Sequence, residues 1–292
     1  MNKNIIAASA SVFGALTIAA ITKKTLKKSF AENVDGTNQT VLITGGSNGI
    51  GKELAEIFAR HKFNLVLAAR NEEKLNSVAD ELKNLYNVDI QIISVDLSTQ
   101  EGANRLYNEI CKKNIVIDQF VNNAGAGKAG DLIYTDTQTL IDLMNLNVVS
   151  VTLLDKYIAS DMVKRGKGKI LNVASLSGYL PDPGLNIYGP TKAYERYLGE
   201  AMYGELLGTG VTVSTLCPGP VKTNWSSNAG RKDSVISANP KYIAKIAFEG
   251  MQNGDLIIVP KASFKALRLG SNFVPTTTKI RLLRRFQNGL KK

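Results

Sequence analysis

The chain has 292 residues, of which 44% are hydrophobic and 21% charged, with a formal net charge of +11. This composition predicts a folded chain with a sizeable core and excludes a disordered or collagen-like one. Two cysteines, Cys111 and Cys217, argue against a disulfide framework, and a single histidine, His61, argues against a multi-histidine metal site. We therefore expect no metal centre.

The positive charge lies at the two ends of the chain. Residues 1–29 hold five lysines and residues 261–292 hold nine basic side chains, and neither segment contains an acid, whereas residues 30–260 have a net charge of −3. Basic tails on a mildly acidic body favour an anionic membrane surface over a groove for DNA. We expect a membrane partner and no nucleic acid.

An uncharged run of 17 residues, 5–21, precedes the lysine-rich segment TKKTLKK. As a helix the run would be about 25 Å long, which is marginal for a hydrocarbon core of about 30 Å. We interpret it as a membrane anchor, with a cleaved signal peptide and a surface-lying helix as alternatives. Four lysines follow the run and one precedes it, so an anchor would leave the rest of the chain in the cytosol.

From residue 40 onward, short apolar runs alternate with helical patterns. We predict strands over 40–44, 64–69, 90–95, 117–121, 168–173, 212–216 and 256–259, and helices over 50–60, 71–85, 99–113, most of 136–165, 190–207 and 240–252. This alternation predicts a doubly wound α/β fold, a parallel sheet with helices on both faces. The predicted organisation is an anchor and linker (1–39), one catalytic domain (40–260) and a basic tail (261–292).

The first predicted strand runs into a glycine-rich turn, TGGSNGIG at 44–51, which opens the first helix. Gly45, Gly49 and Gly51 would let the backbone approach a pyrophosphate at the helix N-terminus. The turn lacks the GK[ST] ending of a P-loop, which makes ATP an unfavoured ligand. A purely structural turn is the alternative.

Arg70 ends the second predicted strand, 19 residues after Gly51. An NAD site is expected to carry an acid near this position for the ribose 2′-hydroxyl, whereas an arginine can pair with a 2′-phosphate. We therefore predict NADP(H) in preference to NAD(H). The alternative is a surface arginine held by Glu72 or Glu73.

Further candidates follow later strands, at the sheet edge where open α/β folds bind ligands. Asp96 and Leu97 are suited to the adenine, and the small residues Ala124 and Gly125, next to Asn123, leave room for a ribose. Ordinary loop chemistry is the alternative for both groups.

Ser175 follows the fifth predicted strand, and YGPTK at 188–192 opens the next helix. In a helix, Tyr188 and Lys192 lie on one face, and Pro190 is tolerated in the first turn. A nearby ammonium would lower the tyrosine pKa from about 10 toward working pH. Tyr188 is then a candidate general acid for a carbonyl oxygen, which Ser175 could also bind. The alternative is an ordinary Tyr–Lys pair on a helix.

Together with Asn147 in LNVVS and PGPV at 218–221, these motifs resemble the short-chain dehydrogenase/reductase family over residues 40–260. The resemblance implies a Rossmann fold and a catalytic tetrad of Asn147, Ser175, Tyr188 and Lys192. In that scheme Tyr188 donates the proton, Ser175 positions the carbonyl, Lys192 holds the nicotinamide ribose and lowers the tyrosine pKa, and Asn147 anchors a water. The membrane-associated hydroxysteroid and 3-oxoacyl reductases are the most similar branch.

The resemblance also implies a cofactor site, in which Val221 and Thr223 contact the carboxamide and Asn123 helps to hold the central strands. Asn48 stands where some NADP-preferring relatives carry a basic residue, which leaves the cofactor preference to Arg70. The predicted cofactor residues are Gly45, Ser47, Asn48, Gly49, Ile50, Gly51, Arg70, Asp96, Leu97, Asn123, Ala124, Gly125, Tyr188, Lys192, Pro218, Gly219, Val221 and Thr223.

The substrate is expected to be a hydrophobic ketone, aldehyde or 3-oxoacyl compound. Residues 224–239 would form a lid in this family, and Trp225, Tyr179 and Leu180 are candidate apolar walls, although the last two could instead pack at the sheet edge. The alternative function is a non-catalytic, NADP(H)-binding membrane scaffold or redox sensor. Family members are commonly homodimers or homotetramers.

The C-terminal tail has apolar and basic residues interleaved between 280 and 290. This pattern is typical of a basic amphipathic helix on an anionic membrane. A helix that docks on the domain or on an oligomer partner explains the pattern equally well.

Overall fold

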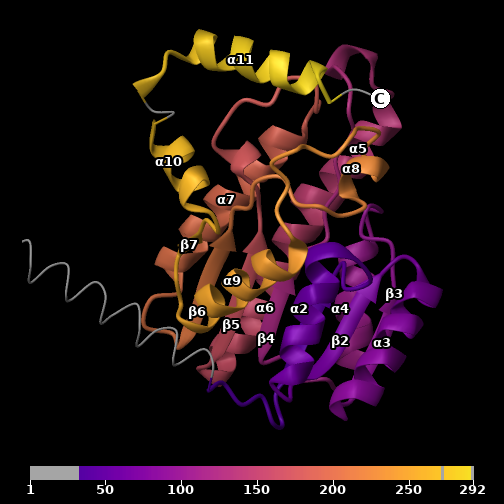
Figure 1. Ribbon diagram of the computed structural model, residues 1–292. Helices are drawn as coiled ribbons and strands as arrows, with labels where there is room; N and C mark the ends of the chain where they lie inside the picture. The colour runs from indigo at the N-terminus through magenta and orange to yellow at the C-terminus, as the bar shows by residue number, and fades with distance from the viewer. Residues whose placement is uncertain (1–32, 271–272, 291–292) are drawn as a thin grey trace, which may run out of the picture. The chain divides into compact units, whose positions relative to one another are not determined.

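The computed structural model describes residues 33–270 and 273–290, so the apolar run 5–21 lies outside the described residues. The described residues from Asp35 onward form one compact unit. Its core is a parallel seven-stranded sheet in the order β3-β2-β1-β4-β5-β6-β7 (Figure 1). The strands are β1 (Thr40–Thr44), β2 (Asn64–Ala69), β3 (Ile90–Ser94), β4 (Gln119–Asn122), β5 (Gly168–Val173), β6 (Val211–Leu216) and β7 (Ile257–Ile258).

Helices connect the strands and follow the last one. They are α2 (Gly49–Arg60), α3 (Glu72–Tyr86), α4 (Gly102–Lys112), α5 (Thr137–Met144), α6 (Ser150–Arg165), α7 (Tyr188–Glu205), α8 (Trp225–Asn228), α9 (Pro240–Gln252), α10 (Ala262–Gly270) and α11 (Thr276–Asn288). Within the described ranges, none is both long and apolar enough to cross a membrane.

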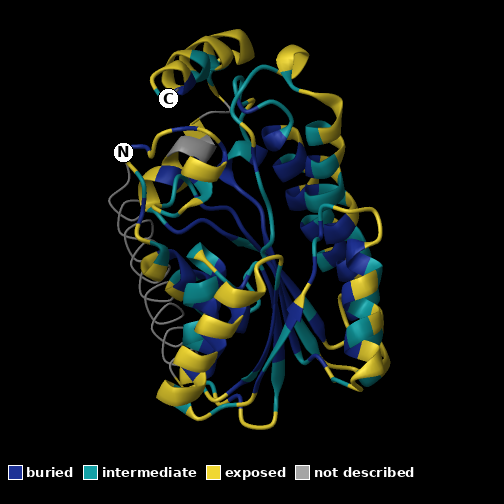
Figure 2. Ribbon diagram, turned by 90° about the vertical axis from the view of Figure 1, so that its right-hand side faces the viewer, coloured by how far each residue is buried: buried dark blue, intermediate teal, exposed yellow. Residues whose placement is uncertain are grey.

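The helices form two layers around the buried sheet (Figure 2). One layer contains α4, α6 and α7, whose apolar side chains share a core cluster with the strands, Leu106, Leu154 and Met202 among them. In the other layer α2 packs against α3 and α9, and the rings of Phe58 and Phe248 meet edge to face at 5.1 Å. Because both faces of the sheet are covered, the central strands β1 and β2 are buried along nearly their whole length rather than on alternate residues.

Asparagine side chains cap three of the helices that follow strands or loops. The Asn48 carboxamide accepts the Gly49 N–H at the start of α2, and Asn71 accepts the Lys74 N–H at the start of α3. Asn239 caps α9, where Pro240 occupies the first turn and needs no backbone donor. These caps fix where each helix begins, and therefore where the preceding loop ends.

The predicted doubly wound α/β architecture is confirmed, with local differences. The predicted helix over 136–165 is interrupted by a π-helical turn (Asn145–Val149) between α5 and α6. The helix predicted over 190–207 already begins at Tyr188, because Pro190 lies in the first turn, where its missing N–H costs no hydrogen bond. Strand β7 has two residues, fewer than predicted.

The carboxyl ends of the strands meet at one edge of the sheet because all of the strands are parallel. The glycine-rich turn follows β1, Arg70 follows β2, Asn123 follows β4, and Ser175 comes two residues after β5. The fold therefore collects most of the predicted site residues at this edge.

Candidate active site

The glycine-rich turn is folded as tightly as its sequence requires. Gly45 and Gly49 have φ of +68° and +56°, in the left-handed region that favours glycine. A Cβ on Gly51 would lie 2.3 Å from the Gly45 carbonyl oxygen, so a side chain does not fit there. The turn leads directly into α2, whose first N–H groups can bind a pyrophosphate.

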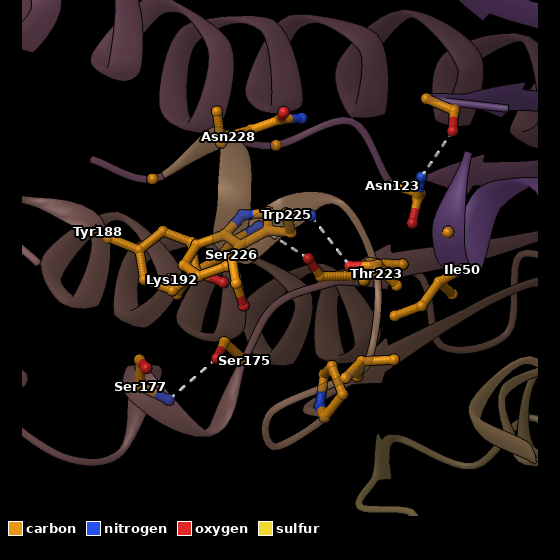
Figure 3. A pocket seen from close by; sticks show the side chains of 18 of the residues that line it. Ile50, Asn123, Ser175, Ser177, Tyr188, Lys192, Thr223, Trp225, Ser226 and Asn228 are labelled. Atoms are coloured by element: carbon orange, nitrogen blue, oxygen red, sulfur yellow. Dashed lines mark hydrogen bonds between the residues drawn. The ribbon is translucent and has the colours of Figure 1, made fainter. Parts of the chain in front are cut away.

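A cavity of about 680 Å³ opens along the carboxyl edge of the sheet. With one exception, every predicted cofactor residue lines it; the exception is Gly51, which lies buried against Gly45. In Figure 3 Ile50 and Asn123 lie at one end of the cavity, and Tyr188, Lys192 and Trp225 lie at the other. An elongated dinucleotide fits this arrangement, with its phosphates at α2 and its reactive ring near Tyr188.

Arg70 lies at the adenosine end of the cavity. Its side chain is 69% exposed, and its Nη1 lies 4.0 Å from Oδ2 of Asp96. Oδ1 of Asp96 accepts hydrogen bonds from the N–H and the hydroxyl of Ser98, at 2.9 and 2.7 Å. Lys74 lines the same end, so two cations lie where a 2′-phosphate would be bound.

Asn123 joins the two central strands, as the sequence analysis expected. Its backbone N–H donates to Oγ1 of Thr44 at 2.9 Å, and its Nδ2 donates to the Thr44 carbonyl oxygen at 2.9 Å. The end of β4 is therefore fixed against the end of β1, beside the glycine-rich turn.

Tyr188 is buried at the start of α7, where Trp225 covers it at 4.8 Å between ring centroids. Burial raises the pKa of Tyr188, and a hydrogen bond with Ser175 and the charge of Arg231 oppose this rise. The direction is the reverse of the lowering predicted from Lys192. The ammonium of Lys192 lies 5.9 Å from the centroid of the tyrosine ring and is bound to a carboxylate of its own.

That carboxylate belongs to Glu195, which the sequence analysis did not single out. Lys192 Nζ donates to Glu195 Oε1 and Oε2 at 2.8 and 2.7 Å, and to the Val173 carbonyl oxygen at 2.9 Å. Both side chains are buried, so the pair is fixed in one geometry. The spacing of three residues on one helix was the available signal.

Asn147 lies in the π-helical turn between α5 and α6, a feature frequent at functional sites. Its side chain accepts the Ala126 N–H at 3.1 Å and donates to the Ala126 carbonyl oxygen at 2.8 Å and to Thr191 Oγ1 at 3.0 Å. Asn147 is thereby held behind the small residues at 124–127 and next to the helix that carries Tyr188. Its fully buried side chain lies outside the cavity lining.

The substrate end of the cavity is largely apolar. Trp225 and Leu180 line it, and so do Leu283 and Phe286 of α11. Tyr179 does not: it packs against the core cluster around Leu176, and the Arg196 guanidinium lies 4.4 Å from its ring centroid. Of the three predicted apolar wall residues, Trp225 and Leu180 therefore line the cavity. Tyr179 does not, because its ring packs against Arg196 and the cluster around Leu176.

Helix α11 lies beyond the carboxyl edge of the sheet (Figure 1), and its Leu283 and Phe286 line this end of the cavity. Docking on the domain was one of the two alternatives for this helix, and the sequence did not indicate where it would dock. Arg284 forms a two-pronged ion pair with Asp131, with Nη2 2.7 Å from Oδ2. Gln287 donates to Asp182, and the Leu290 carbonyl oxygen accepts the Lys232 N–H at 3.0 Å. These contacts attach the C-terminal helix to the loops around the substrate end.

The site therefore combines a dinucleotide cradle with a buried tyrosine and serine next to a fixed lysine, and comparisons with known proteins agree. The family model described as short chain dehydrogenase matches residues 39–234. The chain belongs to the short-chain dehydrogenase/reductase family and is an oxidoreductase of that type.

Several relatives of known name are similar over most of the chain. The human very-long-chain 3-oxoacyl-CoA reductase is 31% identical over 231 residues, which cover 76% of this chain and 73% of that protein. The hydroxysteroid dehydrogenase-like protein 1 of Gallus gallus is 33% identical over 188 residues, or 64% of this chain and 56% of that protein. A solved short-chain dehydrogenase from Sphingobium yanoikuyae in complex with NADPH has a TM-score of 0.75 and 28% identity, covering 80% and 92% of the two chains.

Proposed function

We propose that this protein is an NADPH-dependent reductase of a hydrophobic 3-oxoacyl thioester. The observation that carries the proposal is a buried Tyr188, beside Ser175, at the apolar end of a cavity whose other end fits a dinucleotide. Because burial raises its pKa, Tyr188 keeps its proton at neutral pH and can donate it. A protonated acid suits the reduction of a ketone.

When bound, the nicotinamide would supply the hydride to the carbonyl carbon. Tyr188 would donate its proton to the carbonyl oxygen, and Ser175 would hydrogen-bond the same oxygen and keep it in place. Lys192, held by Glu195, would fix the nicotinamide ribose. Asn147 would hold the backbone at Ala126 in place behind that ribose. The position of each side chain supports the role proposed for it.

Two features support the choice of cofactor and substrate. Arg70 and Lys74 give the adenosine end the positive charge that a 2′-phosphate needs. The substrate end is closed by Trp225 and by Leu283 and Phe286 of α11, which suits an acyl chain. The similarity to the human very-long-chain 3-oxoacyl-CoA reductase extends over three quarters of the chain and favours a 3-oxoacyl group over a simple ketone or a steroid.

The test is a substrate panel on the full-length protein, with NADPH oxidation followed by absorbance. The panel holds matched 3-oxoacyl thioesters of increasing chain length, simple long-chain ketones, aldehydes and a steroid ketone, each with NADPH and with NADH. We expect the highest kcat/KM for a long-chain 3-oxoacyl thioester with NADPH. NADPH binding without oxidation by any compound would support the non-catalytic scaffold instead.

A membrane location is part of the proposal. In α11 the exposed side chains include Arg281 and Arg285 together with Leu282, a mixture that suits an anionic lipid surface. Such a location would bring the apolar end of the cavity close to lipid-soluble acyl chains.

A further inference from the structure

Arg231 is a buried cation without a hydrogen-bond partner for its Nε. It follows α8 in the loop that covers the substrate end, and its side chain is 7% exposed. The Nε atom is inaccessible and makes no hydrogen bond, and no ion pair within 4.0 Å joins the guanidinium to a described carboxylate. A guanidinium that is buried without a carboxylate partner carries a desolvation cost, which an acceptor oxygen on a ligand in the cavity would offset.

The loop holds Arg231 in a defined place. Its backbone N–H donates to the Ser226 carbonyl oxygen at 2.9 Å, and the Ala129 N–H donates to the Ala229 carbonyl oxygen at 2.7 Å. Pairing between Val221 and Ala238 closes the base of the loop. The backbone at Arg231 therefore has a fixed place in the cavity wall.

Arg231 lines the same cavity as Tyr188 and Trp225. Its charge also acts on Tyr188, because it is among the influences that lower the pKa of that phenol. Arg231 and Tyr188 therefore face the same cavity, at the end that Trp225 also lines.

Asp182, one of the two acids near Arg231, already has hydrogen-bond partners. Asp182 accepts a hydrogen bond from the Ser177 hydroxyl at 2.7 Å and another from Gln287. The negative fields of Asp182 and Asp233 favour the charged form of Arg231, although burial lowers its pKa overall. Its charge is thus partly balanced from a distance, while no described residue accepts a hydrogen bond from its guanidinium.

A 3-oxoacyl thioester carries a second carbonyl oxygen two carbons away from the ketone that is reduced. With the ketone at Tyr188, that second oxygen needs a donor on the same side of the cavity. We propose that Arg231 binds the acyl carbonyl oxygen of the substrate and so selects 1,3-dicarbonyl compounds over simple ketones; this inference rests on the proposed function. A neutral carbonyl suits the position better than a carboxylate, which would add a third negative charge next to Asp182 and Asp233.

The experiment compares two probes in the full-length protein. One is the N-acetylcysteamine thioester of a medium-chain 3-oxo acid, and the other is the matched 3-oxo thioether, in which a methylene replaces the acyl carbonyl. In Arg231→Gln we expect kcat/KM to fall roughly 10- to 100-fold for the thioester and less than about threefold for the thioether. The free 3-oxo acid, as a third probe, should be a poorer substrate of the wild type than the thioester.

Controls separate substrate binding from other roles. Lys232→Gln removes an exposed neighbouring charge and should leave both probes unaffected. Arg231→Lys keeps the charge but loses the planar fork, and should retain only part of the preference for the thioester. NADPH affinity and the thermal midpoint of Arg231→Gln should stay close to wild type, because the guanidinium Nε has no partner to lose.

The outcomes are distinguishable. Equal losses on both probes would show that Arg231 acts through Tyr188 or the fold, and no loss on either would show that it does not touch the substrate; both overturn the inference and leave the proposed function standing. A wild type that reduces the thioether but not the thioester overturns the 3-oxoacyl assignment and the Arg231 inference with it.

Discussion

The proposed preference for NADPH depends on Arg70. It lies at the end of β2 beside Asp96 and is mostly exposed, so a substitution there should not disturb the core. In Arg70→Asp, the ratio of kcat/KM with NADPH to that with NADH should fall at least roughly 10-fold, since an acid repels a 2′-phosphate and can accept from a 2′-hydroxyl. Lys113→Asp, an exposed charge reversal outside the cavity lining, is the control. An unchanged ratio in Arg70→Asp would refute the role.

Asp155 links stability to pH. Its carboxylate is 1% exposed and accepts hydrogen bonds from Asn122 and Asn172 at 3.1 and 2.8 Å, yet burial raises its pKa from 3.8 to about 7. The folded protein therefore holds a proton that the unfolded chain loses above about pH 4. Folding stability should fall as the pH rises from about 4 to about 7 and then level off.

The Asp155→Asn variant cannot lose that proton. Its free energy of unfolding, measured by urea denaturation, should lack the Asp155 contribution, which has a slope of at most about 1.4 kcal/mol per pH unit. The difference between wild type and variant should therefore change steadily between about pH 4 and pH 7 and be constant above. A constant difference over the whole range would contradict the buried, protonated carboxyl.

At the scale of elements, α11 of the basic tail lines the substrate end of the cavity with Leu283 and Phe286. The ion pair between Arg284 and Asp131 attaches it, and both side chains remain about one third exposed. Such a partly exposed pair contributes little to stability, because water and salt screen it. Arg284→Asp should therefore raise KM for a long-chain substrate by up to about fivefold and change kcat little, because it loosens the cover without touching the tetrad.

Exchanging the two charges of the Arg284–Asp131 pair tests whether this ion pair holds α11. Asp131→Arg combined with Arg284→Asp should restore KM, and Arg281→Asp, an exposed reversal on the same helix, should have no effect on it. If KM rises equally in Arg284→Asp and Arg281→Asp, the ion pair is not what holds the helix.

Several elements could be predicted from local pattern alone, and the exceptions depend on distant contacts. The strands of the central sheet are apolar runs, and their order along the chain implied the parallel sheet. The π-helical turn at Asn145–Val149 has no signature in residue periodicity, because it is held by bonds from Asn147 to Ala126 and Thr191. The place of α11 over the cavity depends on Asp131 and Asp182, more than 100 positions away in sequence.

The site residues also divide into those that local sequence predicts and those that depend on distant contacts. Tyr188, Ser175 and the glycine-rich turn carry their spacing in the sequence, so they could be named in advance. Glu195 was missed although its spacing from Lys192 was visible, because one acid in a charged helix gives no sign of burial. Arg231 gives no sequence signal, since its significance is a buried guanidinium whose Nε lacks a partner.

For the whole molecule, charge distribution predicts behaviour at membranes. The two ends together carry +14, and the rest of the chain carries −3. The full-length protein should co-sediment with vesicles that contain an anionic phospholipid, and bind less as salt rises, because the attraction is screened. Vesicles of neutral phosphatidylcholine are the control for the apolar contribution. A protein that stays in the supernatant with anionic vesicles at low salt would contradict the membrane proposal.

The central claim is that Tyr188 donates the proton in an NADPH-dependent reduction, and the Tyr188→Phe variant tests it most directly. With the best 3-oxoacyl thioester, kcat/KM should fall by about 10²- to 10⁴-fold. The affinity for NADPH, measured by fluorescence titration, should stay within about threefold of wild type because the phenol hydroxyl does not hold the phosphates. Tyr197→Phe, an exposed tyrosine on the same helix, should keep full activity. Turnover by Tyr188→Phe at the wild-type rate would contradict the account.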